Sequence, residues 1–197
     1  MAELYRKRLL IPAEEVQRRV SELAEQISTD YEGKVPVLVG VLNGAFMFMA
    51  DLVRRLKIDC EIDFVKLSSY GRRKESSGKV RLLKDLGLDI RDRDVLVVED
   101  IVDSGLSVQW LRRYLESRGP RSLRFVTFLR KEGAARVDYD VEYVGFDIPN
   151  LFVVGYGLDF AEKFRNFPEI FVLEEGTEGT KPHPAKKPEI SGKTDPV

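Results

Sequence analysis

The sequence predicts a single α/β domain built on a mainly parallel, twisted β-sheet flanked by helices. Apolar runs of strand length alternate with segments of helical periodicity, the pattern of right-handed β-α-β crossovers. Runs such as 35–42 and 95–98 are continuously apolar, which favours strands covered on both faces. With 197 residues, 43% of them hydrophobic and 33% charged, the chain can bury one substantial core.

The individual elements follow from periodicity and from turn residues. Helices are expected at 13–29, at 46–56 and from the turn after Asp103 to Gly119-Pro120, and strands at 35–42, 58–70, 95–98, 122–130, 141–146, 151–157 and 170–175. The polar, Gly- and Ser-rich segment 71–80 predicts a loop or hairpin tip. After Glu175 the composition shifts to Gly, Thr, Pro and Lys, so we expect a folded domain over 1–175 and a disordered tail over 176–197.

Composition and charge argue against several classes of partner. The formal net charge is −1, so no general basic field favours nucleic acid. No long uncharged apolar run predicts a membrane span. The first residues, MAELYRKRLLIP, lack the apolar core of a signal peptide. We therefore expect a cytoplasmic protein with neither a nucleic-acid nor a membrane partner.

Scarce residue types and missing motifs exclude several chemistries. The single cysteine, Cys60, and the single histidine, His183, rule out internal disulfides, Cys-rich zinc sites and Ser-His-Asp triads in the folded part. Any general base there must be a carboxylate, Lys or Tyr, and Cys60 is interpreted as a packing residue. A P-loop motif is missing, and Gly155 and Gly157 supply only half of G-x-G-x-x-G, with Phe160 in place of the third glycine.

The segment VLVVEDIVDSGLS, residues 95–107, is the most informative stretch. A buried-type strand ends in Glu99 and Asp100, then Asp103 follows, and a Ser-Gly-Leu-Ser turn leads into a helix. Ligands of parallel sheets bind at the carboxyl ends of the strands. Free N–H groups and the helix dipole make such a turn an anion pocket. Acids beside an anion pocket predict a ligand with a phosphate and with hydroxyl or metal-bound groups, and a ribose 5-phosphate fits.

This segment resembles the phosphoribosyl-pyrophosphate signature of type I phosphoribosyltransferases. Three further motifs, VGVLNGAFMFMADL (39–52), KLSSYG (66–71) and VGFDIPNLFVVGYGLDFAEKFRN (144–166), match the hypoxanthine-guanine phosphoribosyltransferases in order and spacing. The resemblance covers roughly residues 5–175. It implies the type I phosphoribosyltransferase fold, with a small hood region over the active site. It also implies purine salvage: transfer of the 5-phosphoribosyl group from phosphoribosyl pyrophosphate to N9 of hypoxanthine or guanine, giving IMP or GMP and pyrophosphate.

The resemblance also implies roles for individual residues. Asp103 would accept the purine N7 proton or its hydrogen bond. The phosphoribosyl group would be bound by Glu99, Asp100, Ser104, Gly105, Leu106 and Ser107. Glu99 and Asp100 would bind its hydroxyls directly or through Mg²⁺, and Asp159 would ligate a second Mg²⁺. Pyrophosphate would be bound by Leu42, Asn43, Gly44 and Arg165, in a loop that often contains a non-proline cis peptide bond; many members have Lys where this chain has Asn43. The purine would be bound by Lys131, Phe152 and Val153, and a lid would begin at Ser69 and Tyr70.

Simpler interpretations stand beside these roles. Asp103 is also a good helix N-cap residue, and Phe152 and Val153 also suit core packing.

The enzyme could use another base such as xanthine. A regulatory RNA binder on the same fold would need more than the basic clusters 54–55 and 72–74. A sensor of phosphoribosyl pyrophosphate without turnover would not need Asp103 and Lys131. Family members form homodimers or homotetramers, and either is expected here.

Overall fold

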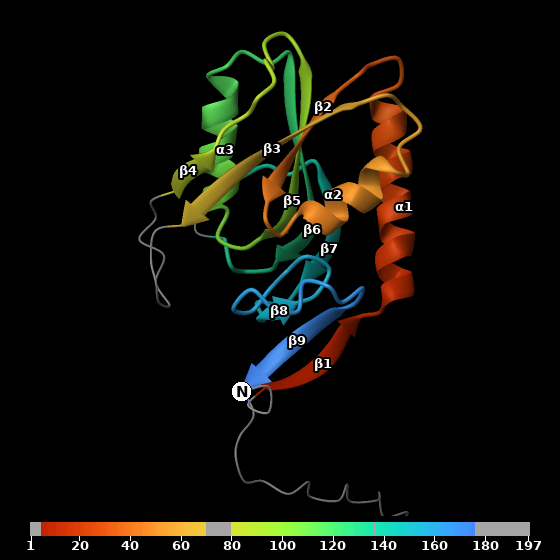
Figure 1. Ribbon diagram of the computed structural model, residues 1–197, viewed down its shortest axis with the longest axis vertical. Coiled ribbons are helices and arrows are strands. Elements are labelled where there is room, and N and C mark those ends of the chain that lie inside the picture. The colour runs from red at the N-terminus through yellow and green to blue at the C-terminus, as the bar shows by residue number, and fades with distance from the viewer. Residues whose placement is uncertain (1–4, 70–79, 136, 176–197) are drawn as a thin grey trace, which may run out of the picture.

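A six-stranded sheet forms the centre of the fold, and a separate three-stranded sheet lies beyond one end of it (Figure 1). The computed structural model describes residues 5–69, 80–135 and 137–175. Its elements are β1 Tyr5–Ile11, α1 Ala13–Asp30, β2 Val37–Leu42, α2 Phe46–Val53, β3 Glu61–Ser69, β4 Val80–Lys84, β5 Asp94–Val102, α3 Leu106–Glu116, β6 Ser122–Lys131, β7 Tyr143–Ile148, β8 Val153–Val154 and β9 Ile170–Glu175.

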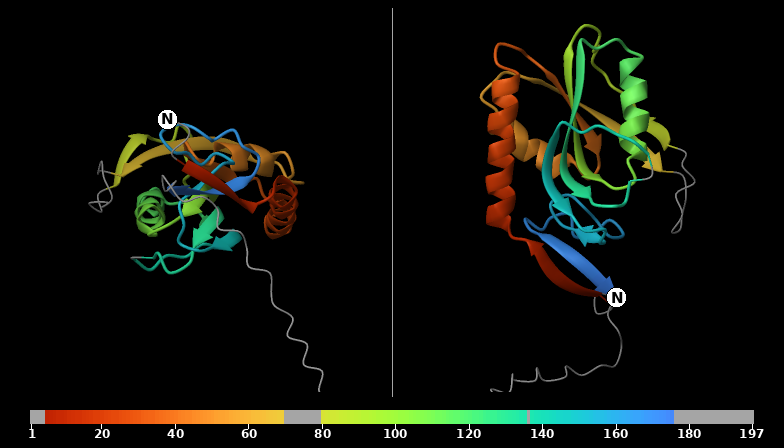
Figure 2. Two further views of the ribbon diagram at one scale, coloured as in Figure 1. Left: turned by 90° about the horizontal axis from the view of Figure 1, so that it is seen from below. Right: turned by 180° about the vertical axis from the view of Figure 1, so that it is seen from behind.

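The central sheet confirms the predicted α/β class. Its strand order is β4-β3-β2-β5-β6-β7, and all neighbours pair in parallel except β4, which runs antiparallel to β3. Helices α1 and α2 cover one face and α3 the other (Figures 1 and 2). Along β2, Leu38 packs with the first pair of helices, whereas Val37 and Val39 pack with α3. The continuous apolar run therefore reflects burial on both faces.

The three-stranded sheet, with order β1-β9-β8, is antiparallel and lies beyond the carboxyl ends of β6 and β7 (Figures 1 and 2). This position agrees with the expected hood region. Segments 151–157 and 170–175 therefore do not extend the parallel sheet. The first of them contains only the two-residue strand β8, because the chain turns back at Gly155 and Gly157.

Several boundaries differ from the predictions. Helix 46–56 ends at Val53, strand 58–70 begins at Glu61, and strand 141–146 extends instead over Tyr143–Ile148. Strands β1 and β4 were not predicted, because their exposed, charged side chains hide the apolar pattern of a strand. The hairpin of β3 and β4 encloses residues 70–79, which lie outside the described residues, as does the predicted tail. Among the helices that the structure describes, none is long and apolar enough to cross a membrane.

Candidate active site

The carboxylates of β5 stand beside the start of α3, as the sequence predicts. Glu99 and Asp100 lie near the carboxyl end of β5, and Asp103 follows the strand. The N-cap of α3 is Gly105, with a φ of 78°, so the interpretation of Asp103 as the N-cap is wrong. A cavity of about 80 Å³ opens between the acids and the turn, and it is lined by Glu99, Ile101, Val102, Asp103, Ser104, Gly105, Ser107 and Val108. Leu106 is the first residue of the helix.

The carboxyl groups of Glu99 and Asp100 on β5 form a poorly solvated pair. Glu99 is only 5% exposed, and its Oε1 atom is buried without a hydrogen-bond partner. Burial, followed by the charge of Asp100, raises the pKa of Glu99 well above its ordinary value. Burial likewise raises the pKa of Asp100 to about 6, although the Ile101 N–H group and the Arg165 cation favour its charged form. Such a pair gains stability from a nearby cation.

The raised pKa of Glu99 leads to a prediction about stability. Folding imposes no ionisation penalty below the ordinary pKa of 4.5, and the penalty grows as the pH rises towards the raised value. We therefore expect Glu99→Gln, without ligand or divalent cation, to have a higher Tm than the wild type, by a margin that grows as the pH rises above 4.5. Scanning calorimetry measures both Tm values. The control Glu25→Gln, at an exposed residue of α1, should show no growing margin. A margin that is constant or shrinks with pH would contradict the assignment.

The loop after β2 contacts the carboxylate of Asp100. Its Leu42–Asn43 peptide bond is cis, which confirms the expectation for this loop. The parallel register pairs Gly40 with Val98. Two residues further along each strand, Leu42 at the start of the loop is therefore level with Asp100. A Cβ atom on Gly44 would lie 1.5 Å from Asp100 Oδ2. Only a glycine lets the loop backbone approach the acid this closely.

A second loop, formed by residues 155–165, completes this side of the site. Gly157 has a φ of 98°, and a Cβ atom there would lie 2.0 Å from the carbonyl oxygen of Gly44. The Arg165 guanidinium donates to the Gly157 carbonyl at 2.8 Å and pairs with Asp159 at 2.7 Å. The charge of Asp159 also acts on Asp100. The structure therefore brings together residues from two motifs more than a hundred positions apart in the sequence.

Lys131 and Asp103 meet on the opposite side of the acids. The register of β5 and β6 pairs Val102 with Arg130, so the two following side chains leave the strands together. Lys131 Nζ lies 3.1 Å from Asp103 Oδ2, and the Lys131 side chain is 12% exposed against 57% for Asp103. The sequence offered no local sign that Lys131 differs from a surface lysine. Parallel pairing alone provides its partner.

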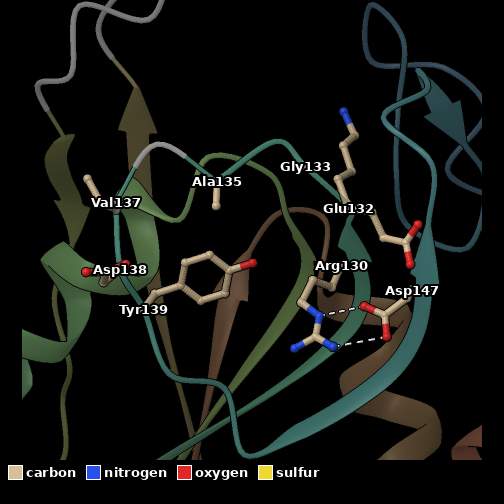
Figure 3. A pocket seen from close by; sticks show the side chains of 9 residues that line it. Arg130, Glu132, Gly133, Ala135, Val137, Asp138, Tyr139 and Asp147 are labelled. Atoms are coloured by element: carbon tan, nitrogen blue, oxygen red, sulfur yellow. Dashed lines mark hydrogen bonds and ion pairs between the residues drawn. The ribbon is translucent and has the colours of Figure 1, made fainter.

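A larger pocket of about 570 Å³ opens beside Lys131 (Figure 3). Arg130 forms a two-bond ion pair with Asp147 at 2.6 and 3.0 Å, and the ring of Tyr139 extends towards that pair (Figure 3). The remaining lining residues are Glu132, Gly133, Ala135, Val137 and Asp138. This volume lies within the range of small-molecule sites, so the pocket gives Lys131 a polar space in which to meet a ligand.

The remaining residues that the resemblance assigns to the site differ in their exposure and position. Phe152 is 51% exposed and contacts Phe160 edge-on, with ring centroids 5.8 Å apart, so core packing does not explain it. Val153 is buried in β8, as the packing interpretation expects. Ser69 ends β3 opposite Val80. Tyr70 lies outside the described residues.

Sequence reasoning missed two side chains that contact these loops, Tyr139 and Tyr156. The ring of Tyr139 packs closely against the Gly105 backbone: a Cβ atom added to Gly105 would lie 2.3 Å from that ring. Tyr156 donates a hydrogen bond to Asp51 of α2. Tyr139 belongs to no pattern that marks it in the sequence, and Tyr156 lies in the motif 144–166 without a role assigned to it. The isolated placement of Tyr156 between two glycines was the one available sign.

Comparison with known proteins gives a consistent result. A family model described as the phosphoribosyl transferase domain matches residues 12–161. The chain is 50% identical over 182 residues to a hypoxanthine-guanine phosphoribosyltransferase from Mycobacterium tuberculosis, covering 88% of this chain and 90% of that protein. It is 43% identical to the Bacillus subtilis protein of the same name, covering 85% and 93%. A crystal structure of a Bacillus anthracis hypoxanthine-guanine phosphoribosyltransferase superposes with a TM-score of 0.81 at 46% identity, covering 86% and 99%.

Proposed function

We propose that the side chains gathered at the carboxyl edge of the central sheet form the active site of this chain, since the chain belongs to the hypoxanthine-guanine phosphoribosyltransferase family. It is a purine-salvage transferase: it moves the 5-phosphoribosyl group from phosphoribosyl pyrophosphate to N9 of hypoxanthine or guanine, giving IMP or GMP and pyrophosphate. The observation that best supports the assignment of residues is the Lys131–Asp103 contact of 3.1 Å beside the acids of β5.

The purine would be held by its 6-oxo and N7 edge. These two groups are neighbours on the base, and the ammonium of Lys131 and the carboxylate of Asp103 are neighbours in the site. Lys131 would donate to the 6-oxo oxygen and Asp103 would accept the N7 proton, while the exposed ring of Phe152 supplies a stacking surface. The backbone of Val153 would read the base edge. The 6-amino group of adenine cannot accept the bond from Lys131, so adenine is disfavoured.

The phosphoribosyl group would occupy the space between β5 and α3. The first N–H groups of α3 have no acceptor within the helix, so they suit the 5-phosphate, together with Ser104, Gly105 and Ser107. Glu99 and Asp100 would bind the ribose hydroxyls, either directly or through a cation. Holding both reactants in line is a large part of the catalytic effect in such a transfer.

Magnesium fits the acidic side of the site. The buried Oε1 of Glu99 lacks a partner, and Asp100 and Asp159 repel each other. Over the described residues no group of three metal-ligating side chains could hold a metal ion by itself, so Mg²⁺ there would take its remaining ligands from water and from substrate phosphates. Bound there, Mg²⁺ would neutralise the departing pyrophosphate. The backbone of Leu42, Asn43 and Gly44, with Arg165, would hold the same pyrophosphate.

A base panel tests this proposal. Purified protein is incubated with phosphoribosyl pyrophosphate, Mg²⁺ and one of hypoxanthine, guanine, xanthine or adenine, and nucleotide formation is measured. We expect turnover with hypoxanthine or guanine and none with adenine. In Lys131→Ala the KM for the base should rise by about 10- to 100-fold, the value of one hydrogen bond to a charged group, while the KM for phosphoribosyl pyrophosphate stays near the wild-type value.

Other outcomes would overturn parts of the assignment. Equal effects of Lys131→Ala on both KM values would remove Lys131 from the base pocket, and preferred turnover of xanthine would change the substrate. No turnover with any base would favour a regulatory protein. The RNA-binding alternative has little support, because Arg54 and Arg55 are engaged with Asp51, Gln17 and backbone carbonyls. The cluster 72–74 lies outside the described residues.

Lid, assembly and location complete the proposal. Residues from Ser69 and Tyr70 onward would close over the reacting centre and exclude water, because a ribosyl cation would otherwise be hydrolysed. A homodimer or homotetramer in the cytoplasm is the assembly that the family resemblance supports. Residues 1–175 would form the catalytic domain and 176–197 a disordered tail. Sedimentation of the full chain measures its oligomeric state.

A further inference from the structure

A partly buried hydrogen bond connects the 155–165 loop to α2. The hydroxyl of Tyr156 donates to Asp51 Oδ2 at 2.7 Å. Tyr156 is 2% exposed, and its ring packs against Phe128 in the core, with centroids 4.8 Å apart. Asp51 lies in the second turn of α2, on the helix that directly follows the Gly44 loop. The bond therefore joins two elements that both carry site residues.

Asp51 is the centre of a network rather than an isolated acceptor. Gln17 of α1 donates to the same Oδ2 atom at 3.0 Å, and Arg54 and Arg55 pair with the other oxygen. Burial alone would raise the pKa of Asp51, but the hydrogen bonds from Gln17, Tyr156 and Arg54 outweigh it and lower the pKa. The acceptor is therefore a charged carboxylate held in place by α1 and α2, and bonds to charged acceptors are among the stronger ones.

Tyr156 is also directly connected to the pyrophosphate side of the site. The next residue, Gly157, donates its N–H to the Arg165 carbonyl at 2.9 Å and accepts from the Arg165 guanidinium at 2.8 Å. Its Cα lies against the carbonyl of Gly44. Displacing Tyr156 would shift Gly157, and with it Arg165 and the Gly44 loop. The 155–165 loop is thus contacted at two points, by Gly44 in the loop before α2 and by Asp51 within the helix.

We propose that Tyr156 and Asp51 are positioning residues, which set the distance between the Gly44 loop and Arg165 and thereby determine how tightly pyrophosphate and phosphoribosyl pyrophosphate bind. Neither side chain contacts a reacting atom. The proposal rests on the proposed function, because it assigns the pyrophosphate to this side of the site. It predicts a selective effect on binding. Changes at Tyr156 or Asp51 should weaken the binding of phosphoribosyl pyrophosphate and pyrophosphate. They should not weaken the binding of the purine, which would be held across the site by Lys131 and Asp103.

Tyr156→Phe removes one oxygen atom and tests the proposal. We expect the KM for phosphoribosyl pyrophosphate to rise roughly 10-fold, below the roughly 100-fold cost of misplacing a group by a full ångström. The KM for hypoxanthine should stay at the wild-type value. Inhibition by pyrophosphate should weaken in the same proportion as the donor KM rises. An unchanged donor KM, or equal increases in both KM values, would overturn the proposal.

Tyr143→Phe is the matched control. Tyr143 is also 2% exposed, and its hydroxyl donates to a carboxylate, Asp30, at the same distance of 2.7 Å. It begins β7, at the end of the sheet away from the site. Both substitutions should lower Tm, but only Tyr156→Phe should raise the donor KM. If Tyr143→Phe raises that KM equally, general destabilisation explains the effect and the positioning role is wrong.

Variants of Asp51 give a second, independent test. Asp51→Ala should raise the donor KM as Tyr156→Phe does. The double variant should have the same donor KM as Asp51→Ala alone, because the two substitutions remove the same hydrogen bond. Asp51→Asn keeps an acceptor for Tyr156 and should restore most of the affinity. Independent, additive effects would overturn the coupling. A wild-type protein that turns over no base would overturn the proposed function itself, whereas normal wild-type turnover with unaffected variants overturns only the positioning role.

Discussion

Asp103→Asn is expected to lower kcat for IMP formation by at least about 100-fold, the lower range of general acid–base contributions. A carboxamide still accepts a hydrogen bond from the purine N7–H group but cannot take up its proton. The side chain of Asp103 is 57% exposed, so the substitution should not disturb folding. The KM for phosphoribosyl pyrophosphate should change little, because in the proposed site the 5-phosphate would be held by the turn that follows Asp103 and by the first residues of α3.

Steady-state kinetics with hypoxanthine separates these quantities. Asp89→Asn is a suitable control, since Asp89 is an exposed residue before β5, at the other end of the same strand. It should retain the wild-type kcat. A wild-type kcat in Asp103→Asn would show that the carboxylate does not accept the proton. A large rise in the donor KM with unchanged kcat would place Asp103 in the phosphoribosyl site instead.

Gly44→Ala is expected to reduce kcat/KM for phosphoribosyl pyrophosphate by at least about 100-fold, the scale set by displacing binding groups by an ångström. The new Cβ atom would lie 1.5 Å from Asp100 Oδ2, so either the loop or the acid must move. The acid has little freedom, because its other oxygen accepts from the Ile101 N–H group at 2.9 Å. On the other side, the Gly44 carbonyl lies against Gly157. Any movement would therefore disturb the proposed ribose and pyrophosphate contacts together.

Gly87→Ala is the matched control for this variant. A Cβ atom on Gly87 would have Asp63 Oδ2 as its nearest neighbour at 3.8 Å, an ordinary van der Waals contact. Its activity should be that of the wild type. Calorimetric titration with phosphoribosyl pyrophosphate and Mg²⁺ shows whether Gly44→Ala has lost binding or only turnover. Wild-type binding together with wild-type kcat would contradict the tight approach of the loop to Asp100.

The sequence by itself determined the α/β class and the main features of the site. The apolar run of β5, its terminal acids and the Gly- and Ser-containing turn are local signals, because burial on both faces, strand ends and helix starts all act within a few residues. The cis bond in the loop at Leu42, Asn43 and Gly44 was expected from the family resemblance alone, and it is present. Local patterns therefore predicted which segments could bind an anion.

The tertiary structure decided which distant side chains act together. Lys131 meets Asp103 only because β6 pairs in parallel with β5 in one register. Strand β1 exists because β9 pairs with it, since its own charged sequence gives no strand pattern. Asp51 and Tyr156 are separated by 105 positions, and their bond forms only when α2 packs beside the 155–165 loop. Sheet register and packing are long-range properties, because they depend on which surfaces are buried together and not on any single segment.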